Sequence, residues 1–167
     1  MKTIKNRVTD YFIQLKTKGV ARKLDSTLSF PISSEKIKKV LIILPRNLES
    51  LDRASNFVQS LKKHYPKWRV ELFDVDKLGK NDLNNMQLPK PEVVNKLKAA
   101  NYNFVLDLND ANDQIASFIT LMTEAPYRMN LNRDGETSYN IAFQPQRADG
   151  AIRYESVLQY LSQLITV

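Results

Sequence analysis

The sequence predicts an α/β fold in which helices cover both faces of one mostly parallel sheet. Apolar, β-branched runs such as VLIIL at 40–44 recur along the chain, and segments with helical spacing of apolar residues separate them. Strands that alternate with helices favour βαβ units, and right-handed crossovers then give a doubly wound, Rossmann-like layer. The 167-residue chain is long enough for one such domain with a sizeable core.

The first half of this domain is expected to contain two strands and two helices. In chain order these are a strand over 39–44, a helix over 50–65, a strand over 68–75, a polar loop over 76–90 and a helix over 91–100. The first strand is apolar at nearly every position, as in a strand buried on both faces. Pro66 lies just beyond the first helix, and Pro91 suits the first turn of the second.

The second half continues the alternation. It is expected to hold a strand over 102–108, a helix over 111–123, short strands over 127–131 and 139–143, and a closing helix over 154–165. The closing helix carries Val157, Leu158, Leu161 and Leu164 on one stripe, which is typical of a helix that packs on a sheet.

The basic charge of the chain is concentrated before the domain. Residues 1–39 hold ten Lys and Arg against three acids, and the net charge of the whole chain is +7. We therefore divide the chain into a basic arm and connector over 1–35 and a Rossmann-like domain over 36–167. The arm suggests an acidic partner, an anionic membrane surface or nucleic acid. The candidate partner-binding or anion-binding residues are Lys2, Lys5, Arg7, Lys16, Lys18, Arg22, Lys23 and, in the domain, Arg46.

Residues 3–23 of this arm have the pattern of an amphipathic helix. Its apolar positions are Ile4, Val8, Tyr11, Phe12 and Leu15. Such a helix can dock on the domain, or it can bind a membrane surface or a partner. Nucleic acid is the less favoured partner, because Tyr11 and Phe12 fall on the apolar face rather than among the lysines.

Composition excludes several classes of site. The chain has no cysteine and one histidine, His64, so disulfides, thiolate metal sites and multi-histidine metal sites are excluded. No signal-peptide pattern and no apolar run of membrane-spanning length is present. We expect a cytoplasmic protein, with peripheral attachment at the inner face of the membrane as an alternative, and we expect no cofactor and no metal.

Two strand ends are the candidate sites for chemistry, because ligands bind beyond the carboxyl ends of parallel strands. The stretch at 45–50, PRNLES, contains no glycine and therefore cannot form a phosphate cradle of the usual kind. Glu49 and Ser50 are expected at a helix start, where an acidic side chain complements the helix dipole and a serine can cap.

The stretch at 107–113, DLNDAND, carries Asp107, Asp110 and Asp113. These carboxylates could hold Mg²⁺ or Ca²⁺, but capping of the next helix is favoured, with Asn109 or Asp110 as the N-cap and Asp113 in the first turn.

Two stretches resemble the acceptor-binding, N-terminal domain of the ADP-heptose–lipopolysaccharide heptosyltransferases. They are KVLIILPRNLESLDRASNFVQSLKKHYPKWRVELF and NYNFVLDLNDANDQIASFITLMTEAPYRMNL. The resemblance implies one half of a two-domain GT-B enzyme, a Gly-Asp turn with a catalytic aspartate, and a donor domain for the sugar nucleotide. The Gly-Asp positions are Glu49 and Ser50 in this sequence, and Asn56 stands where the family usually has a proline. The chain ends after one domain's length, so we expect a degenerate, single-domain relative.

These observations favour a non-catalytic accessory or adaptor subunit of a larger complex, and a protein partner is the expected ligand. One alternative is a glycosyltransferase, or a half-enzyme that a second chain completes, in which Glu49, Asp52 or Asp107 would act as base or sugar ligand. Another is a small anion-binding or nucleic-acid-binding domain. Catalysis is not expected, because a serine without an activating partner is a poor base. A sugar nucleotide is not an expected ligand, because the first turn lacks the glycines of a phosphate cradle and the resemblance places the donor site in a second domain.

Overall fold

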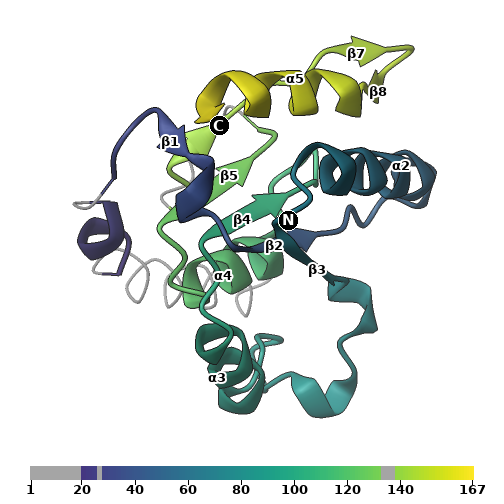
Figure 1. The fold of residues 1–167 in the computed structure, drawn as a ribbon. Helices are drawn as coiled ribbons and strands as arrows, with labels where there is room; N and C mark the ends of the chain where they lie inside the picture. Colours follow the sequence, from purple (N-terminus) through teal and green to yellow (C-terminus); the bar gives the residue numbers. More distant parts are fainter. Residues whose placement is uncertain (1–19, 26–27, 133–137) are drawn as a thin grey trace.

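The computed structural model describes residues 20–25, 28–132 and 138–167, and its centre is a five-stranded sheet (Figure 1). The strands are β2 (Lys39–Ile43), β3 (Arg69–Phe73), β4 (Phe104–Asp107), β5 (Tyr127–Asn130) and β6 (Ile141–Ala142), in the spatial order β3-β2-β4-β5-β6. Every pair in this sheet is parallel. The predicted α/β, Rossmann-like doubly wound fold is therefore confirmed. The order of addition reverses between β2 and β4, which is the topological switch point where such sheets bind ligands.

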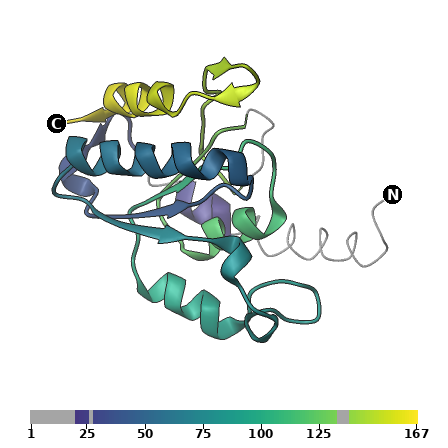
Figure 2. The ribbon, with the colours of Figure 1, turned by 90° about the vertical axis from the view of Figure 1, so that its right-hand side faces the viewer.

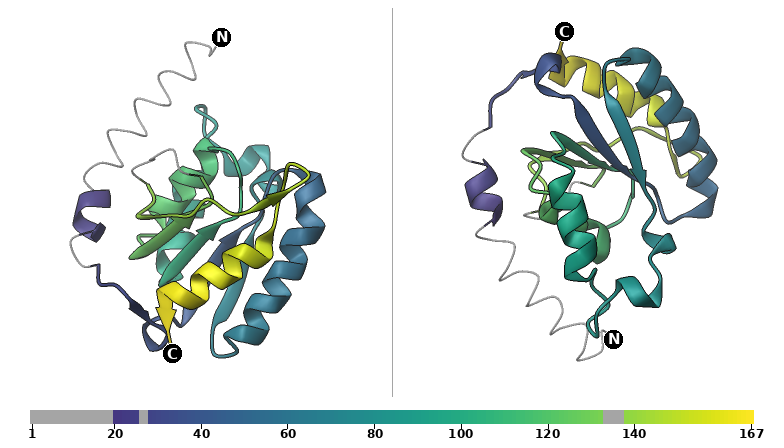
Figure 3. Two further views of the ribbon diagram at one scale, coloured as in Figure 1. Left: turned by 90° about the horizontal axis from the view of Figure 1, so that it is seen from above. Right: turned by 60° about the horizontal axis from the view of Figure 1, so that its bottom comes forward.

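Four helices cover the two faces of this sheet. Helices α2 (Leu48–His64) and α5 (Tyr154–Leu164) lie side by side on one face, and α3 (Pro91–Ala99) and α4 (Gln114–Met122) lie on the other (Figures 2 and 3). The side chains of β2 alternate accordingly. Val40 and Ile42 join the core beneath α2 and α5, whereas Leu41 and Ile43 join the core beneath α3 and α4. All four are essentially inaccessible, as the apolar run predicted.

Two predicted helix starts need correction. Helix α2 begins at Leu48, and its N-cap is Asn47, whose side chain accepts a hydrogen bond from the Glu49 N–H; Ser50 lies within the first turn. Helix α4 begins at Gln114, and its N-cap is Asp113, not Asn109 or Asp110. An earlier start for α4 is disfavoured because the Asn109 side chain is bonded to the neighbouring strand end instead of to this helix.

Two small strand pairs were not predicted, and one of their strands begins at Ile165, the last residue of the predicted closing helix. Strand β1 (Ile32–Ser33) pairs in parallel with β9 (Ile165–Thr166) at the end of the chain. Strands β7 (Arg147–Ala148) and β8 (Ala151–Ile152) form a hairpin. Its turn residues, Asp149 and Gly150, both have positive φ, the backbone geometry that Asp-Gly hairpin turns favour.

The described part of the predicted arm and connector packs against the domain. Residues 20–25 are helical, and Ala21 is buried. Asp25 forms an ion pair with Arg128, and the Tyr127 hydroxyl donates a hydrogen bond to the Ser29 carbonyl at 3.1 Å. Of the predicted basic residues, Arg22 and Lys23 lie on this helix and are exposed.

The rest of the predicted helix over 3–23 lies outside the described residues, as do the basic arm residues Lys2, Lys5, Arg7, Lys16 and Lys18. Among the helices of the described segments, none combines the length and the apolar character that crossing a membrane requires.

Candidate functional site

The candidate site lies at the switch point, where the chain leaves β2 and β4 at the same edge of the sheet. The loops after these strands are tied together through one amide side chain. The Arg46 N–H donates to the Asn109 Oδ1 at 2.9 Å, and the Asn109 Nδ2 donates to the Leu44 carbonyl at 3.4 Å. The sequence analysis named the strand ends at 45–50 and 107–113 as the two candidate sites. In the structure these two segments are in contact.

Asp107 occupies the floor of this site and is only 3% exposed. Its Oδ1 accepts hydrogen bonds from the backbone N–H of Asn109 at 3.0 Å and from the Asn109 Nδ2 at 2.7 Å, and its Oδ2 accepts one from the Tyr139 hydroxyl. Burial raises the pKa of Asp107 to about 6, although the hydrogen bonds from Tyr139 and Asn109 oppose this shift. Both oxygens of the carboxylate are therefore engaged by the protein itself.

Arg46 is the cation of the site, and two carboxylates hold it. One guanidinium nitrogen lies 2.8 Å from the Asp113 Oδ2, and another lies 2.8 Å from the Asp76 Oδ1. The hydrogen bond to Asp113 is the largest cause that raises the pKa of Arg46, and partial burial opposes it. The predicted anion-binding residue is thus already neutralised from two sides.

Asp113 serves two positive groups at once. While its Oδ2 pairs with Arg46, its Oδ1 accepts the Ala116 N–H at 2.8 Å and so caps helix α4. A helix N-terminus and an arginine are the two features that most often bind a phosphate. In this chain the Asp113 carboxylate binds both the guanidinium of Arg46 and the N-terminus of α4.

Further residues close the rim of the site. Asp110 pairs with Arg147 of the β7–β8 hairpin at 3.3 Å. The Tyr154 hydroxyl, at the start of α5, donates to the Leu108 carbonyl at 3.2 Å. Burial raises the pKa of Tyr154 to about 12, and a hydrogen bond from Ser50 opposes that rise. Ser50, which stands where the resembled family has its aspartate, therefore contacts a buried phenol.

The other predicted base candidates lie apart from this cluster. Glu49 and Asp52 are exposed on the first turns of α2. Within the described segments, no hydrogen bond or ion pair joins either of them to Asp107. The predicted trio of Asp107, Asp110 and Asp113 is also divided among different partners, and the described residues contain no group of three His, Cys, Asp or Glu that could hold a metal ion.

Sequence reasoning missed several members of the cluster. Asp76 lies in a loop after β3, Tyr139 just before β6, and Tyr154 and Arg147 in the last thirty residues of the chain. No local motif links these positions, because the parallel topology alone brings them to one edge. The available signal was the strand order, since segments that follow β2, β3 and β4 must share this edge.

A groove lies on one helix-covered face of the molecule, between α2 and α5. Its volume is about 400 Å³, its floor includes Phe57, Tyr154 and Leu158, and its rim includes Arg53 and His64. His64 ends α2 and packs edge-on against Tyr65, in keeping with its predicted place at a helix terminus. The groove is separate from the hydrogen-bonded Asp107 cluster, although Tyr154 borders both.

The protein is a doubly wound α/β domain, and the charged side chains at its switch point are paired with one another. Comparisons with protein-family models, with curated proteins and with solved structures each find no match. The resemblance to heptosyltransferases therefore stays a prediction from the sequence.

Proposed function

We propose that this chain is a non-catalytic, Rossmann-like domain that acts as an accessory or adaptor subunit of a larger complex. The observation that carries the proposal is the double role of Asp113. Its carboxylate occupies the N-terminus of α4 and the guanidinium of Arg46, two groups at this edge that are suited to a phosphate. A sugar nucleotide would have to displace a carboxylate that is covalently part of the chain.

The charge around Arg46 also supports this proposal. Asp76, Asp110 and Asp113 surround the site, and Arg46 and Arg147 are the described cations that pair with them. With Asp107 beneath them, the cluster carries more negative than positive charge. A diphosphate that entered would meet repulsion from these carboxylates, and the repulsion is stronger near a buried surface than in water.

The candidate bases support it as well. A general base must reach a substrate proton, and a neighbouring group usually orients it. Asp107 is buried beneath its own hydrogen-bond donors. Glu49 and Asp52 are exposed side chains of α2, and Ser50 contacts Tyr154. None of these carboxylates is therefore both accessible to a substrate and oriented by a neighbouring group, as the base of a transferase would be.

A thermal-shift screen tests the proposal against ADP-, UDP- and GDP-sugars at millimolar concentration. A ligand present at a hundred times its Kd stabilises a protein by about 2.7 kcal/mol, which for a chain of this size raises Tm by several degrees. We expect no rise with any of these compounds. A concentration-dependent rise of about 3 °C or more with any of them would contradict the proposal.

The basic arm is the proposed attachment to the partner, and its role can be tested without disturbing the domain. Deleting residues 1–19 leaves Ala21 and Asp25, which pack on the body, in place. We expect this deletion to abolish recovery of the native partner in an affinity pull-down while the circular-dichroism spectrum keeps its α/β shape.

A charge-matched pair of variants sharpens the test. Replacing Lys16 and Lys18 with glutamine should weaken recovery, whereas the same replacement of Lys62 and Lys63, exposed on α2, should not. If both pairs of variants recover the partner equally well, the arm is not the attachment to the partner. If the arm variants instead lose binding to anionic vesicles and still recover the same proteins, the membrane surface is the target of the arm. That result would contradict the adaptor role.

A further inference from the structure

Strand β3 forms an open edge of the sheet. In the described part of the chain its only strand neighbour is β2, and the five residues of the two strands pair in one continuous register without a bulge. The opposite edge differs, since β6 has only two residues. Proteins usually protect long, regular edges with proline, bulges or very short strands, because an exposed edge can pair with another chain. Strand β3 has no proline and no bulge and is five residues long, so its protection is limited to the charges of Arg69 and Glu71.

The backbone groups that β3 leaves unpaired can be assigned from its pairing with β2. The Arg69 N–H donates to the Lys38 carbonyl at 2.7 Å, and the Phe73 carbonyl accepts the Leu44 N–H at 2.9 Å. In a parallel ladder the residues that bond to one neighbour alternate with those that face away. Residues 69, 71 and 73 therefore bond to β2, and the backbone groups of Val70 and Leu72 point outward.

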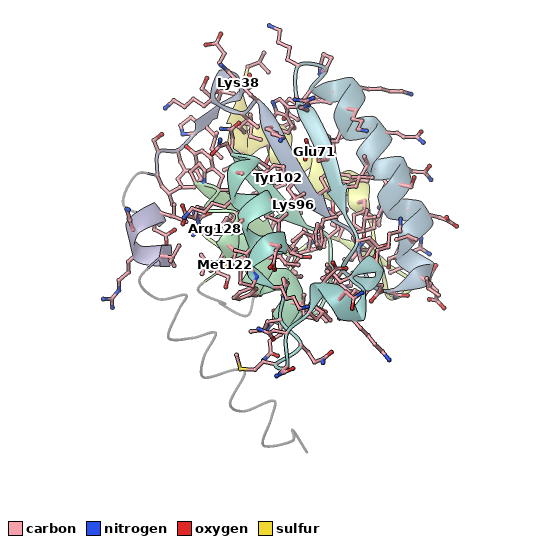
Figure 4. The ribbon with its side chains drawn as sticks, turned by 90° about the horizontal axis from the view of Figure 1, so that it is seen from below. Lys38, Glu71, Lys96, Tyr102, Met122 and Arg128 are labelled. Atoms are coloured by element: carbon pink, nitrogen blue, oxygen red, sulfur yellow. The ribbon has the colours of Figure 1, made fainter. Side chains whose placement is uncertain are left out.

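The side chains of β3 divide between two faces. Trp68, Val70 and Leu72 lie on the α2 side, and Leu72 is 50% exposed despite its apolar character. Arg69 and Glu71 lie on the other side. The Tyr102 hydroxyl donates to the Glu71 Oε2 at 2.5 Å (Figure 4). The Lys39 Nζ lies 3.1 Å from the Glu71 Oε1. Glu71 is thus a fixed carboxylate at the edge, with a cation two residues before it.

We propose that two copies of this chain associate through their β3 edges, antiparallel and centred on Val70, so that the two sheets become continuous. In this register Val70 faces the partner's Val70, and each Arg69 faces a Glu71 of the other copy. Leu72 then lies opposite the partner's Trp68 on the apolar face. The outward N–H and C=O groups of Val70 pair with their symmetry mates.

Other registers of the same strand are less complementary. A two-fold axis at Glu71 would place two carboxylates directly opposite each other, which destabilises a strand pair. An axis at Leu72 would place Glu71 against Phe73. Charge and apolar pattern are therefore self-complementary about Val70 alone, and this favours a second copy of the chain as the occupant. The inference is independent of the accessory function proposed above, because it involves neither Asp113 nor the arm.

Single-cysteine cross-linking of the full chain tests this geometry directly, since the natural sequence has no cysteine. Two facing residues of a hydrogen-bonded antiparallel pair have Cα atoms about 5.5 Å apart, within the range that a disulfide spans. We expect Val70→Cys to form a disulfide-linked dimer on mild oxidation. Leu72→Cys should not, because the two copies of residue 72 would be about 14 Å apart. Leu48→Cys is the control for random collision, since Leu48 is 82% exposed on α2.

Sedimentation equilibrium of the unlinked protein gives the second measurement. At concentrations on the order of 100 µM, suited to a small interface, we expect a monomer–dimer equilibrium. Leu72→Lys should lower the association constant by about tenfold, because the symmetry removes each contact twice, and Leu48→Lys should leave it unchanged. A protein that stays monomeric, a dimer that Leu72→Lys does not weaken, or faster cross-linking at residue 72 or 48 than at residue 70 would each overturn the proposal.

Discussion

Replacing Arg128 with methionine is expected to lower the free energy of unfolding by about 2–6 kcal/mol, the largest effect of any single substitution considered for this protein, because two buried carbonyls lose their partner. Arg128, in strand β5, is 0% exposed. Its Nε donates to the Ser138 carbonyl at 2.7 Å, one Nη donates to the Ala125 carbonyl at 2.7 Å, and the other pairs with Asp25 at 2.7 Å. The guanidinium of Arg128, labelled in Figure 4, therefore joins its own segment to two others, one at Ser138 and one at Asp25.

Methionine keeps much of the buried stem but supplies no donor. The Ser138 and Ala125 carbonyls would then be left without their side-chain partner in the interior, and each buried group that loses a hydrogen bond costs about 1–3 kcal/mol. Asp25 is partly exposed and can be hydrated again, and only the hydrogen bond from the Asn140 Nδ2 at 3.1 Å would still join its carboxylate to the body. The substitution should therefore also expose residues 20–25 to proteolysis.

Urea unfolding followed by tryptophan fluorescence measures the effect, because Trp68 is buried in the core. Arg147→Met is the matched control, since Arg147 pairs with Asp110 in a half-exposed position and such pairs contribute about 0–1 kcal/mol. If Arg128→Met costs no more than Arg147→Met, the buried guanidinium does not stabilise the fold as argued.

Asp107 gives the second large effect, as a dependence of stability on pH. Burial raises the pKa of Asp107 from its ordinary 3.8 to about 6 in the folded protein. Because the folded state holds this proton more tightly than the unfolded chain, the contribution is fully present below the unfolded pKa and is lost as the pH rises through about 6. A shift of this size corresponds to about 3 kcal/mol in total, of which about 1.5 kcal/mol falls between pH 7.5 and pH 5.

Asp107→Asn should remove this dependence. The asparagine amide can accept from Asn109 and donate to the Tyr139 hydroxyl, so the hydrogen bonds keep their geometry while the buried charge disappears. Urea unfolding of both proteins at pH 7.5, 6 and 5 measures the difference. The wild type should become more stable relative to the variant as the pH falls. Parallel pH profiles for the two proteins would mean that Asp107 titrates as an ordinary exposed carboxylate.

The sequence predicts the main elements of the fold well because each is encoded locally. Strand β2 is an uninterrupted apolar run, and α2 and α5 have regular apolar stripes, so burial and periodicity identify them. The β7–β8 hairpin was missed although Asp149-Gly150 is a strong turn signal, because its strands have two residues each. Strands β1 and β9 pair across almost the whole chain, and no local pattern predicts such a contact.

The candidate site was predictable only in part. Arg46 and Asp107 were identified because they follow buried strands, but their partners come from distant segments: Asp76, Tyr139 and Arg147. The role of Arg128 was also hidden. An arginine in a short strand suggests a solvent-facing residue, and two of the three acceptors that allow its burial, the Ser138 carbonyl and the Asp25 carboxylate, lie elsewhere in the chain.

We propose that the chain's own carboxylates close the switch-point edge of the sheet to sugar nucleotides. Amide NMR of the full chain during titration with ADP-, UDP- and GDP-sugars tests it most directly, with the backbone amides of Arg46, Asn109 and Asp110 as reporters. The structure predicts that these amides do not move, because Asp113 already holds Arg46 and the N-terminus of α4. Saturable shifts of these amides with any one sugar nucleotide would contradict the claim.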